Sequence, residues 1–328
     1  MDTAAHGTLT HRVAVGDASS GLGARVLRLL AADPAVVVTG PDTDGGADTL
    51  VWLAAYDADA RATRRESALA GLAAALDAQP TATHVVLVSS AMVYGAWANN
   101  PVPLTEDAIL RPDVEFTYAR QLGAAEQLVD DWRRAAPGRT VTVLRPAVAM
   151  AADAVSGLAN ALAAGMGQRM GEADPPAQFL HLDDLAAAVE LAVVRRLDGV
   201  FNVAPDGWVP GERVRALAGA VPTVKLPDRV NEVVTNLRWR FQRGPIPPGL
   251  RSYTRSPWLV ANDRLKAEGW RPTVTNEQAY VEGTEAKWWT MVSPKRRQEL
   301  ALGALVAVLV AVALGTVKAV RRARARRR

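Results

Sequence analysis

The stretch VAVGDASSGLG, residues 13–23, joins a short apolar run to an amphipathic segment. Val13 to Val15 predicts a buried strand, and Leu22 to Ala31 has apolar residues at helical spacing. The turn between them is rich in small residues, which let backbone amides approach a pyrophosphate at a helix N-terminus. Many α/β proteins carry such a turn without a phosphate, so both interpretations stay open. The candidate binding positions in this stretch are Gly16, Ser19, Ser20, Gly21, Leu22 and Gly23.

Strands and helices alternate through the first 150 residues. Strands separated by helices of ten or more residues are typical of βαβ units, and nearly continuous apolar strands indicate a sheet covered on both faces. The sequence therefore predicts an α/β fold with a doubly wound, parallel, Rossmann-like sheet over about residues 11–150. Besides the elements above, we expect strands at 35–38, 50–53, 84–89 and 141–144, and helices at 64–76 and 118–135.

After Pro146 the pattern changes to shorter elements. We expect a small C-terminal substrate subdomain over about residues 151–285, so that the whole folded domain covers residues 11–285. Its predicted elements are helices at 158–166, 182–194, 263–268 and 278–289, and a short strand at 199–203.

Composition excludes several classes of protein. The chain of 328 residues has no cysteine, which excludes disulfides and thiolate metal sites. Its four histidines are scattered without metal-ligand spacing, so we expect no metal site. The net charge of the chain is +4, and seven positive charges lie in residues 318–328. The rest of the chain therefore has a net charge of −3. The basicity belongs to a tail, so we expect no nucleic-acid partner.

Six further segments occur in a fixed order on the predicted elements. Together this set resembles the extended short-chain dehydrogenases/reductases, the NAD-dependent epimerase/dehydratase family, over roughly residues 11–285. The segments are VSSAMVYG at 88–95, YAR at 118–120, LRP at 144–146, FLHLDDLA at 179–186, GVFNVA at 199–204, and DRLK with GWRP within 263–272.

The resemblance implies NAD or NADP as cofactor and an epimerase, dehydratase or reductase that transfers a hydride. Its substrate would be a nucleotide sugar, a nucleotide-sugar-like small molecule or, at the membrane, a lipid-linked sugar. It places the substrate-orienting Ser/Thr at Ser90 and the general-base tyrosine at Tyr118. It also makes Asp42, near the end of the second strand, a candidate acceptor for the ribose hydroxyls. Ala54 and Ala55, which follow the third strand, are further candidate cofactor-binding positions. Family members often pair two helices into a homodimer, and the helices from Arg64 and Tyr118 are the candidates here.

The chain departs from the family pattern at several of these positions. Leu122 stands where the family has the lysine that activates the tyrosine, and Arg120 is the nearest cation in sequence. Asp17 replaces a glycine of the turn, Val148 replaces an asparagine that contacts substrate, and Trp52 replaces a histidine. The connection from residue 39 to residue 49 is too short for the helix and extra strand that the family places there. A non-catalytic sensor or scaffold of the same fold therefore remains the alternative.

Residues 300–317 form an uncharged, apolar run with basic residues on both sides. Eighteen helical residues span about 27 Å, close to the hydrocarbon thickness of a bilayer. We expect a linker at 286–299, a transmembrane helix at 300–317 and a basic tail at 318–328 that meets membrane lipids. Because the N-terminus has no signal-peptide pattern, we expect the folded domain on the cytoplasmic side. A shallow insertion that keeps both basic clusters on lipid headgroups is the alternative.

Overall fold

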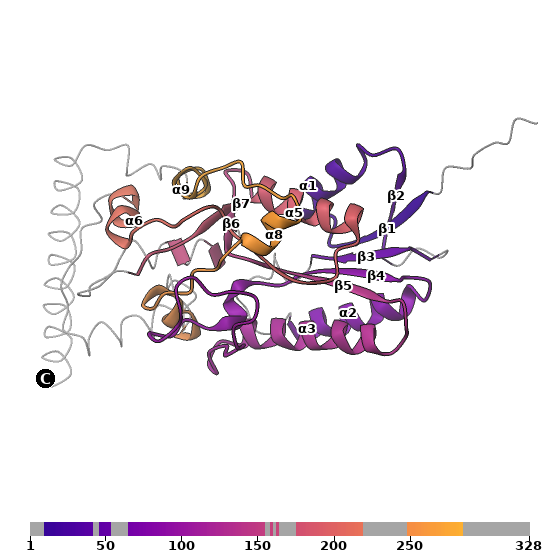
Figure 1. Ribbon diagram of the computed structural model, residues 1–328, viewed down its shortest axis with the longest axis horizontal. Helices are drawn as coiled ribbons and strands as arrows, with labels where there is room; N and C mark the ends of the chain where they lie inside the picture. The colour runs from indigo at the N-terminus through magenta and orange to yellow at the C-terminus, as the bar shows by residue number, and fades with distance from the viewer. Residues whose placement is uncertain are drawn as a thin grey trace, which may run out of the picture.

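The computed structural model describes residues 10–41, 46–53, 65–154, 158–159, 162–163, 175–218 and 248–284. Within them, a parallel sheet lies between two layers of helices, and smaller elements gather beyond one end of the sheet (Figure 1).

The main sheet has six strands in the order β2-β1-β3-β4-β5-β8, and every neighbouring pair is parallel. The chain leaves β1 toward β2 on one side and returns past β1 to β3 on the other. This reversal puts a topological switch point between β1 and β3, where ligands of doubly wound folds bind at the carboxyl edge. The strands are β1 (His11–Gly16), β2 (Val36–Thr39), β3 (Thr49–Trp52), β4 (His84–Val88), β5 (Thr140–Pro146) and β8 (Gly199–Val203).

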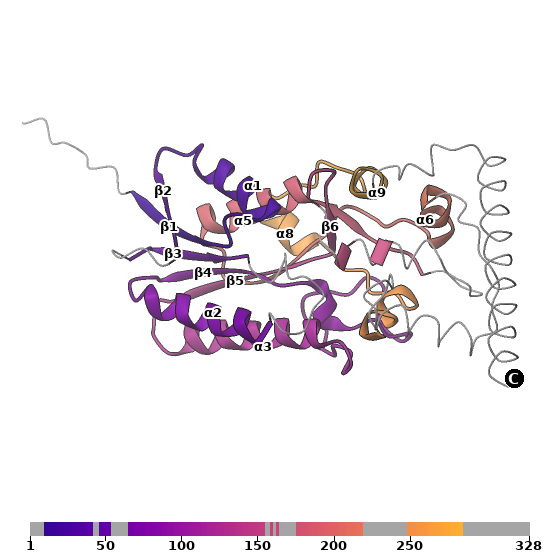
Figure 2. The same ribbon diagram turned by 180° about the vertical axis from the view of Figure 1, so that it is seen from behind.

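Helices cover both faces of this sheet (Figures 1 and 2). On one face, α1 (Gly21–Leu30) packs against α5 (Leu182–Arg195), and on the other lie α2 (Arg65–Ala78) and α3 (Thr117–Arg134). Val13 and Val15 join the buried cluster under α1 and α5, whereas Ala14 joins the cluster under α2 and α3. A strand whose two faces are both buried explains the continuous apolar run of the sequence.

A second, two-stranded parallel sheet lies beyond the carboxyl edge of the main sheet (Figure 1). It pairs β6 (Val148–Met150) with β7 (Phe179–His181), and α9 (Asn276–Thr284) packs on both strands. The remaining elements are the 3-10 helices η2 (Ala91–Tyr94), η3 (Pro248–Leu250) and η4 (Ser252–Thr254), and the helices α6 (Gly211–Ala218) and α8 (Asp263–Ala267).

The structure confirms the predicted α/β class and the parallel, Rossmann-like sheet. It adds β6, β7 and α6, which the sequence prediction missed because three-residue strands and a two-turn helix carry little periodicity. The helix predicted at 278–289 begins two residues earlier, at Asn276, and residues 285–289 lie outside the described residues. Between β2 and β3, residues 40–41 and 46–48 form no helix, as the short connection requires.

The predicted segments 286–299, 300–317 and 318–328 lie outside the described residues. Within the described part of the chain, no helix has the length and apolar character that a bilayer crossing needs.

Candidate functional site

The turn after β1 leads directly into the N-terminus of α1. Asp17 adopts a left-handed backbone with φ of 55°, the conformation for which glycine is favoured. Ser20 caps the helix: its Oγ accepts from the Gly23 amide at 2.9 Å and donates to the Asp17 carbonyl at 2.9 Å. The amides of Gly21 and Leu22 precede the i→i−4 ladder and have no partner inside the helix. They are the groups of this turn that fit an anionic phosphate.

Packing requires glycine at positions 16, 21 and 23 of the turn, because a Cβ at any of them would come too close to neighbouring atoms. A Cβ at Gly16 would lie 2.7 Å from the Trp52 ring. A Cβ at Gly23 would collide with the backbone of Asp17 and Ala18, and one at Gly21 would collide with the Ala154 methyl group. The glycines thus satisfy packing demands of this fold whether or not a phosphate binds.

Arg25 joins α1 to the turn that follows β6. Its guanidinium donates to Asp153 at 2.5 Å, to Asp183 at the start of α5 at 2.6 Å, and to the Gly21 carbonyl at 2.9 Å. The Arg25 side chain is only 12% exposed. These bonds hold Ala154 against Gly21, next to the candidate phosphate position.

Ser90 and Tyr118 come together, as the resemblance implied. Ser90 follows β4 and caps η2 by accepting from the Met92 amide at 3.2 Å, and Tyr118 lies in the first turn of α3. Both line one cavity of about 30 Å³, which has room for one or two water molecules. Among the described residues, the others around this cavity are Ser89, Met92, Pro146, Ala147, Val148, Ala149, Leu158, Ala159, Leu162 and Trp258.

Leu122 is buried at 3% exposure, one turn after Tyr118 on the same face of α3. An apolar side chain therefore occupies the position at which the resemblance implies a lysine. Arg120 is exposed, so this neighbouring cation does not take the place of the missing ammonium. The site brings together a serine and a tyrosine but leaves out the third member of the expected set.

Beneath this cavity lies a buried network of hydrogen bonds and charges. Arg145 pairs with Glu126 at 2.7 Å, and Ser89 Oγ donates to the same carboxylate at 2.5 Å. Arg145 also donates to the hydroxyl of Tyr94 at 2.8 Å, which in turn donates to Asn202 at 2.8 Å. Burial raises the pKa of Tyr94, which keeps its hydroxyl protonated as a donor. The network ties β4, η2, α3, β5 and β8 together under the two candidate catalytic residues.

Sequence reasoning did not identify this network. Arg145 appeared only as part of a motif, and Glu126 was not singled out. The position of Glu126 could have indicated that it lies near the site, because residues 118, 122 and 126 are spaced by four and share one face of α3.

The histidine and the aspartates of the segment 179–186 serve the fold. His181 accepts from the Asp183 amide at 3.2 Å and thereby caps α5. Asp184 accepts from Thr273 Oγ1 at 2.6 Å and from the Val274 amide at 3.0 Å. These contacts fix the start of α5 against the segment 273–274.

Three of the candidate cofactor-binding residues, Asp42, Ala54 and Ala55, lie outside the described residues. Their assignment stays a prediction. Ser19 is exposed in the described turn, whereas Leu22 is buried in the cluster under α1 and α5.

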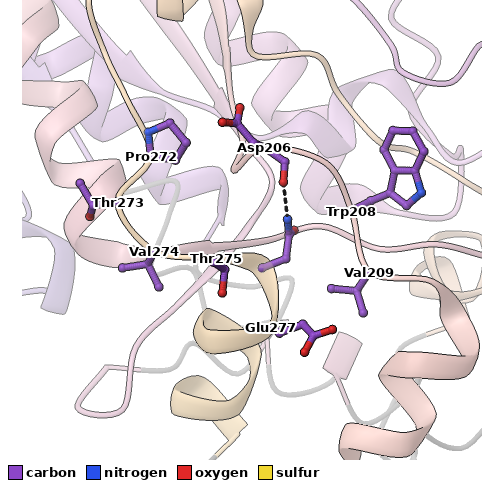
Figure 3. Close-up of a pocket in the computed structure, with 9 residues that line it drawn as sticks. Asp206, Trp208, Val209, Pro272, Thr273, Val274, Thr275 and Glu277 are labelled. Atoms are coloured by element: carbon purple, nitrogen blue, oxygen red, sulfur yellow. Dashed lines mark hydrogen bonds between the residues drawn. The ribbon is translucent and has the colours of Figure 1, made fainter.

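A larger hollow of about 290 Å³ lies between the segment 206–209 and the segment 272–277 (Figure 3). The Asn276 amide bridges its two sides by donating to the Asp206 carbonyl at 2.9 Å. Lys266 binds the Asp206 carboxylate at 2.7 Å and holds the pKa of that carboxyl below its usual value. Arg213 does the same for Glu277 at 2.9 Å. Because both carboxylates are already paired, we place the candidate site at the Ser90–Tyr118 cavity.

Comparison with known sequences now identifies the family. The family described as "NAD dependent epimerase/dehydratase family" matches residues 31–204, more than half of the chain. This chain belongs to the NAD-dependent epimerase/dehydratase family. The match begins after the turn at 16–23, so it does not include the candidate phosphate-binding residues of this family member.

The curated relatives include the uncharacterized protein Rv0501 of Mycobacterium tuberculosis and the uncharacterized protein Mb0513 of Mycobacterium bovis. Each is 30% identical over 210 residues, which cover 64% of this chain and 56% of the relative. This chain thus spans little more than half the length of the curated relatives that it matches.

Solved structures show the same fold at low sequence identity. The UDP-glucose 4-epimerase of Thermus thermophilus, in complex with NAD, has a TM-score of 0.60 and 17% identity, with 83% of this chain and 97% of that chain covered. The human epimerase family protein SDR39U1, with NADPH, has a TM-score of 0.57 and 18% identity, covering 84% and 100%. RMD from Pseudomonas aeruginosa, complexed with NADPH, has a TM-score of 0.55 and 21% identity, covering 84% and 97%.

Proposed function

We propose that this protein binds NAD or NADP and acts, at a membrane, as an epimerase, dehydratase or reductase on a nucleotide sugar or a lipid-linked sugar. The observation that carries the proposal is that Ser90 and Tyr118 line one cavity at the carboxyl edge of the sheet, where the N-terminus of α1 also lies. The similar structures in complex with NAD or NADPH support the choice of cofactor. The membrane location rests on the apolar sequence of residues 300–317.

Each group has a chemical task in this proposal. A bound nicotinamide supplies a site for hydride transfer. The amides of Gly21 and Leu22 hold the diphosphate, since they point from a helix N-terminus. Ser90 donates a hydrogen bond to the substrate oxygen, and the hydroxyl of Tyr118 exchanges a proton with it.

Calorimetric titration of the full-length protein with NAD⁺, NADH, NADP⁺ and NADPH tests the proposal directly. We expect micromolar binding of one redox pair. Ser20→Asp provides the matched variant, because it keeps a capping side chain but adds a negative charge beside the diphosphate, and we expect it to weaken binding by at least about tenfold. If none of the four dinucleotides binds at millimolar concentration, the dinucleotide part of the proposal is wrong.

A second candidate function is a non-catalytic, membrane-tethered sensor or scaffold. The burial of Leu122 favours it, because the activating lysine is replaced by a side chain that packs in the core. Leu122→Lys separates the two functions. A gain in dehydrogenase activity with an otherwise unchanged cofactor affinity would show that the remaining geometry is competent for catalysis. Cofactor binding without turnover in both the parent and Leu122→Lys would favour the sensor.

A further inference from the structure

Exposed apolar side chains gather in the segment that joins η2 to α3. Among the described residues, nine large apolar side chains are exposed, and five of them lie within residues 97–114. Single exposed apolar residues are normal on a protein surface, whereas a concentration of them in one segment marks an interaction site. Ile109 and Val114 are each 77% exposed, the largest fractions among the nine. The five residues are Trp97, Val102, Ile109, Leu110 and Val114.

Hydrogen bonds hold this segment in place, so the exposure of its side chains is a property of the fold. The Leu104 amide donates to the Leu259 carbonyl at 2.7 Å, which ties the middle of the segment to the C-terminal part of the domain. The Trp97 indole N–H donates to the Arg111 carbonyl at 2.8 Å and joins the two halves of the segment. Phe116, two residues beyond the segment, is buried. An anchored segment therefore presents its apolar side chains to the surroundings.

The course of the chain after α9 indicates what covers this surface. α9 ends at Thr284, and the apolar run of the sequence begins at Leu300, so residues 285–299 join them. Fully extended, this connection reaches about 50 Å, roughly the width of a domain of this size. α9 and residues 97–114 both lie at the end of the molecule beyond the carboxyl edge of the main sheet (Figures 1 and 2). A bilayer that receives residues 300–317 therefore lies within reach of the exposed side chains.

We propose that residues 97–114 dock on the surface of a lipid bilayer and place Ile109, Leu110 and Val114 between the headgroups and the upper acyl chains. The inference rests on the membrane location in the proposed function. The segment has three acidic residues and one arginine, so burial of apolar surface, and not attraction to anionic lipid, holds it there. Trp97 fits the same depth, because indole rings are enriched at membrane interfaces.

Docking through this segment also orients the candidate site. Residues 97–114 begin seven residues after Ser90 and end four residues before Tyr118. The side of the domain that carries these two residues therefore comes next to the bilayer. Among the proposed substrates, a lipid-linked sugar fits this orientation, because its lipid part stays in the bilayer while the sugar meets the domain.

The absence of cysteine from the chain makes the test clean, because one introduced cysteine carries one nitroxide label. The labelled variants Ile109→Cys and Val114→Cys are prepared as full-length protein in phosphatidylcholine nanodiscs. The matched control is Val194→Cys, since Val194 is 52% exposed and lies at the amino edge of the sheet, where Arg196 donates to Thr83 Oγ1 at 2.6 Å. Power saturation of the nitroxide signal measures collisions with oxygen, which dissolves in the bilayer, and with a polar nickel chelate, which stays in water.

We expect collisions with the nickel chelate to be at least about tenfold fewer at positions 109 and 114 than at position 194, because hydrocarbon excludes polar solutes. Collisions with oxygen should be more frequent at the same two positions. Ile109→Asp, combined with the label at position 114, should restore nickel collisions to the level of the control, since a charge opposes insertion. Ile109→Leu keeps the apolar surface and should leave the protection unchanged. This pair of variants separates insertion of the segment from the affinity of the label itself for lipid.

Three outcomes overturn the inference. Equal collision rates at the three labelled positions, in a protein that co-elutes with the nanodiscs, remove the docking surface and keep the membrane location. A protein that does not co-elute with the nanodiscs loses the membrane location and the docking surface together. Protection that appears without lipid and grows with protein concentration assigns the surface to a second copy of the chain. The dinucleotide titration is read separately, because none of the labelled positions belongs to the candidate cofactor-binding residues.

Discussion

The Ser90–Tyr118 cavity and the charge network beneath it lie next to each other, yet they differ in the polarity of their side chains. The network keeps a carboxylate, a guanidinium and their partners, all buried and all hydrogen-bonded. One helical turn away, Leu122 has replaced a charge with an apolar side chain, and the cavity walls are apolar too. Removing one partner of a paired buried charge is costly, because the other charge is left buried without compensation. The comparison separates the side chains that stabilise this fold from those of the candidate site.

Breaking the Glu126–Arg145 network should cause the largest loss of stability. Glu126→Leu leaves the Arg145 guanidinium buried without its carboxylate, and such a change costs about 3–5 kcal/mol of unfolding free energy. Urea unfolding measures it. The matched control is Asp131→Asn on the exposed face of α3, for which we expect no measurable change because its pair with Arg134 is open to solvent. Equal stability of Glu126→Leu and the parent protein would show that the network does not support the fold.

The second-largest expected effect concerns His84, the first residue of β4, at the edge of the sheet opposite to the candidate site. Burial, with a smaller contribution from Arg196, lowers the pKa of His84 to about 4. Its ordinary value is near 6.5, so the unfolded chain binds a proton there at a higher pH than the folded protein does. The stability that comes from neutral His84 is therefore present above pH 6.5 and is lost as the pH falls toward 4. The loss amounts to about 3 kcal/mol.

Unfolding curves between pH 7 and pH 4 measure this dependence. His84→Gln keeps a hydrogen-bonding side chain that does not titrate, so we expect a shallower decline with pH than in the parent protein. Parallel curves for the two proteins would contradict the assignment to His84.

The third effect concerns the contact between the N-terminus of α1 and the turn after β6. Arg25→Gln removes two ion pairs, one to Asp153 and one to Asp183. Because both aspartates are largely exposed, we expect a loss of only about 1 kcal/mol. Amide hydrogen exchange across residues 151–154 should accelerate, since the turn loses its anchor. Arg28→Gln, one turn along α1 at an exposed arginine, is the control and should leave that exchange unchanged.

The smallest expected effect has the opposite sign. A Cβ at Gly123, in α3 next to Leu122, meets no atom within 4 Å. Gly123→Ala should therefore stabilise the protein by roughly 0.5–1 kcal/mol, because alanine loses less backbone entropy in a helix. Thermal unfolding measures the gain. A lower unfolding temperature would mean that another surface packs on this position.

The strands of the main sheet were predictable because buried parallel strands are nearly continuous apolar runs. Ser90 and Tyr118 were predictable because a motif fixes their positions on the end of a strand and the start of a helix. The pairs Glu126–Arg145 and Arg25–Asp153 were not, since their partners are 19 and 128 residues apart and nothing local connects them. The strands β6 and β7 were missed because each has only three residues.

The sequence by itself determined the class of fold, the alternation of strands and helices in the first 150 residues, the resemblance to the family, and the apolar residue at position 122. Local patterns determine these properties: apolar periodicity, small residues in turns, and side chains at fixed spacing. Only the tertiary structure decided which side chains share the cavity, that its walls are apolar, and that each glycine of the first turn faces protein atoms. Such properties depend on which distant segments meet, and the free energy of their contacts is set by packing in three dimensions.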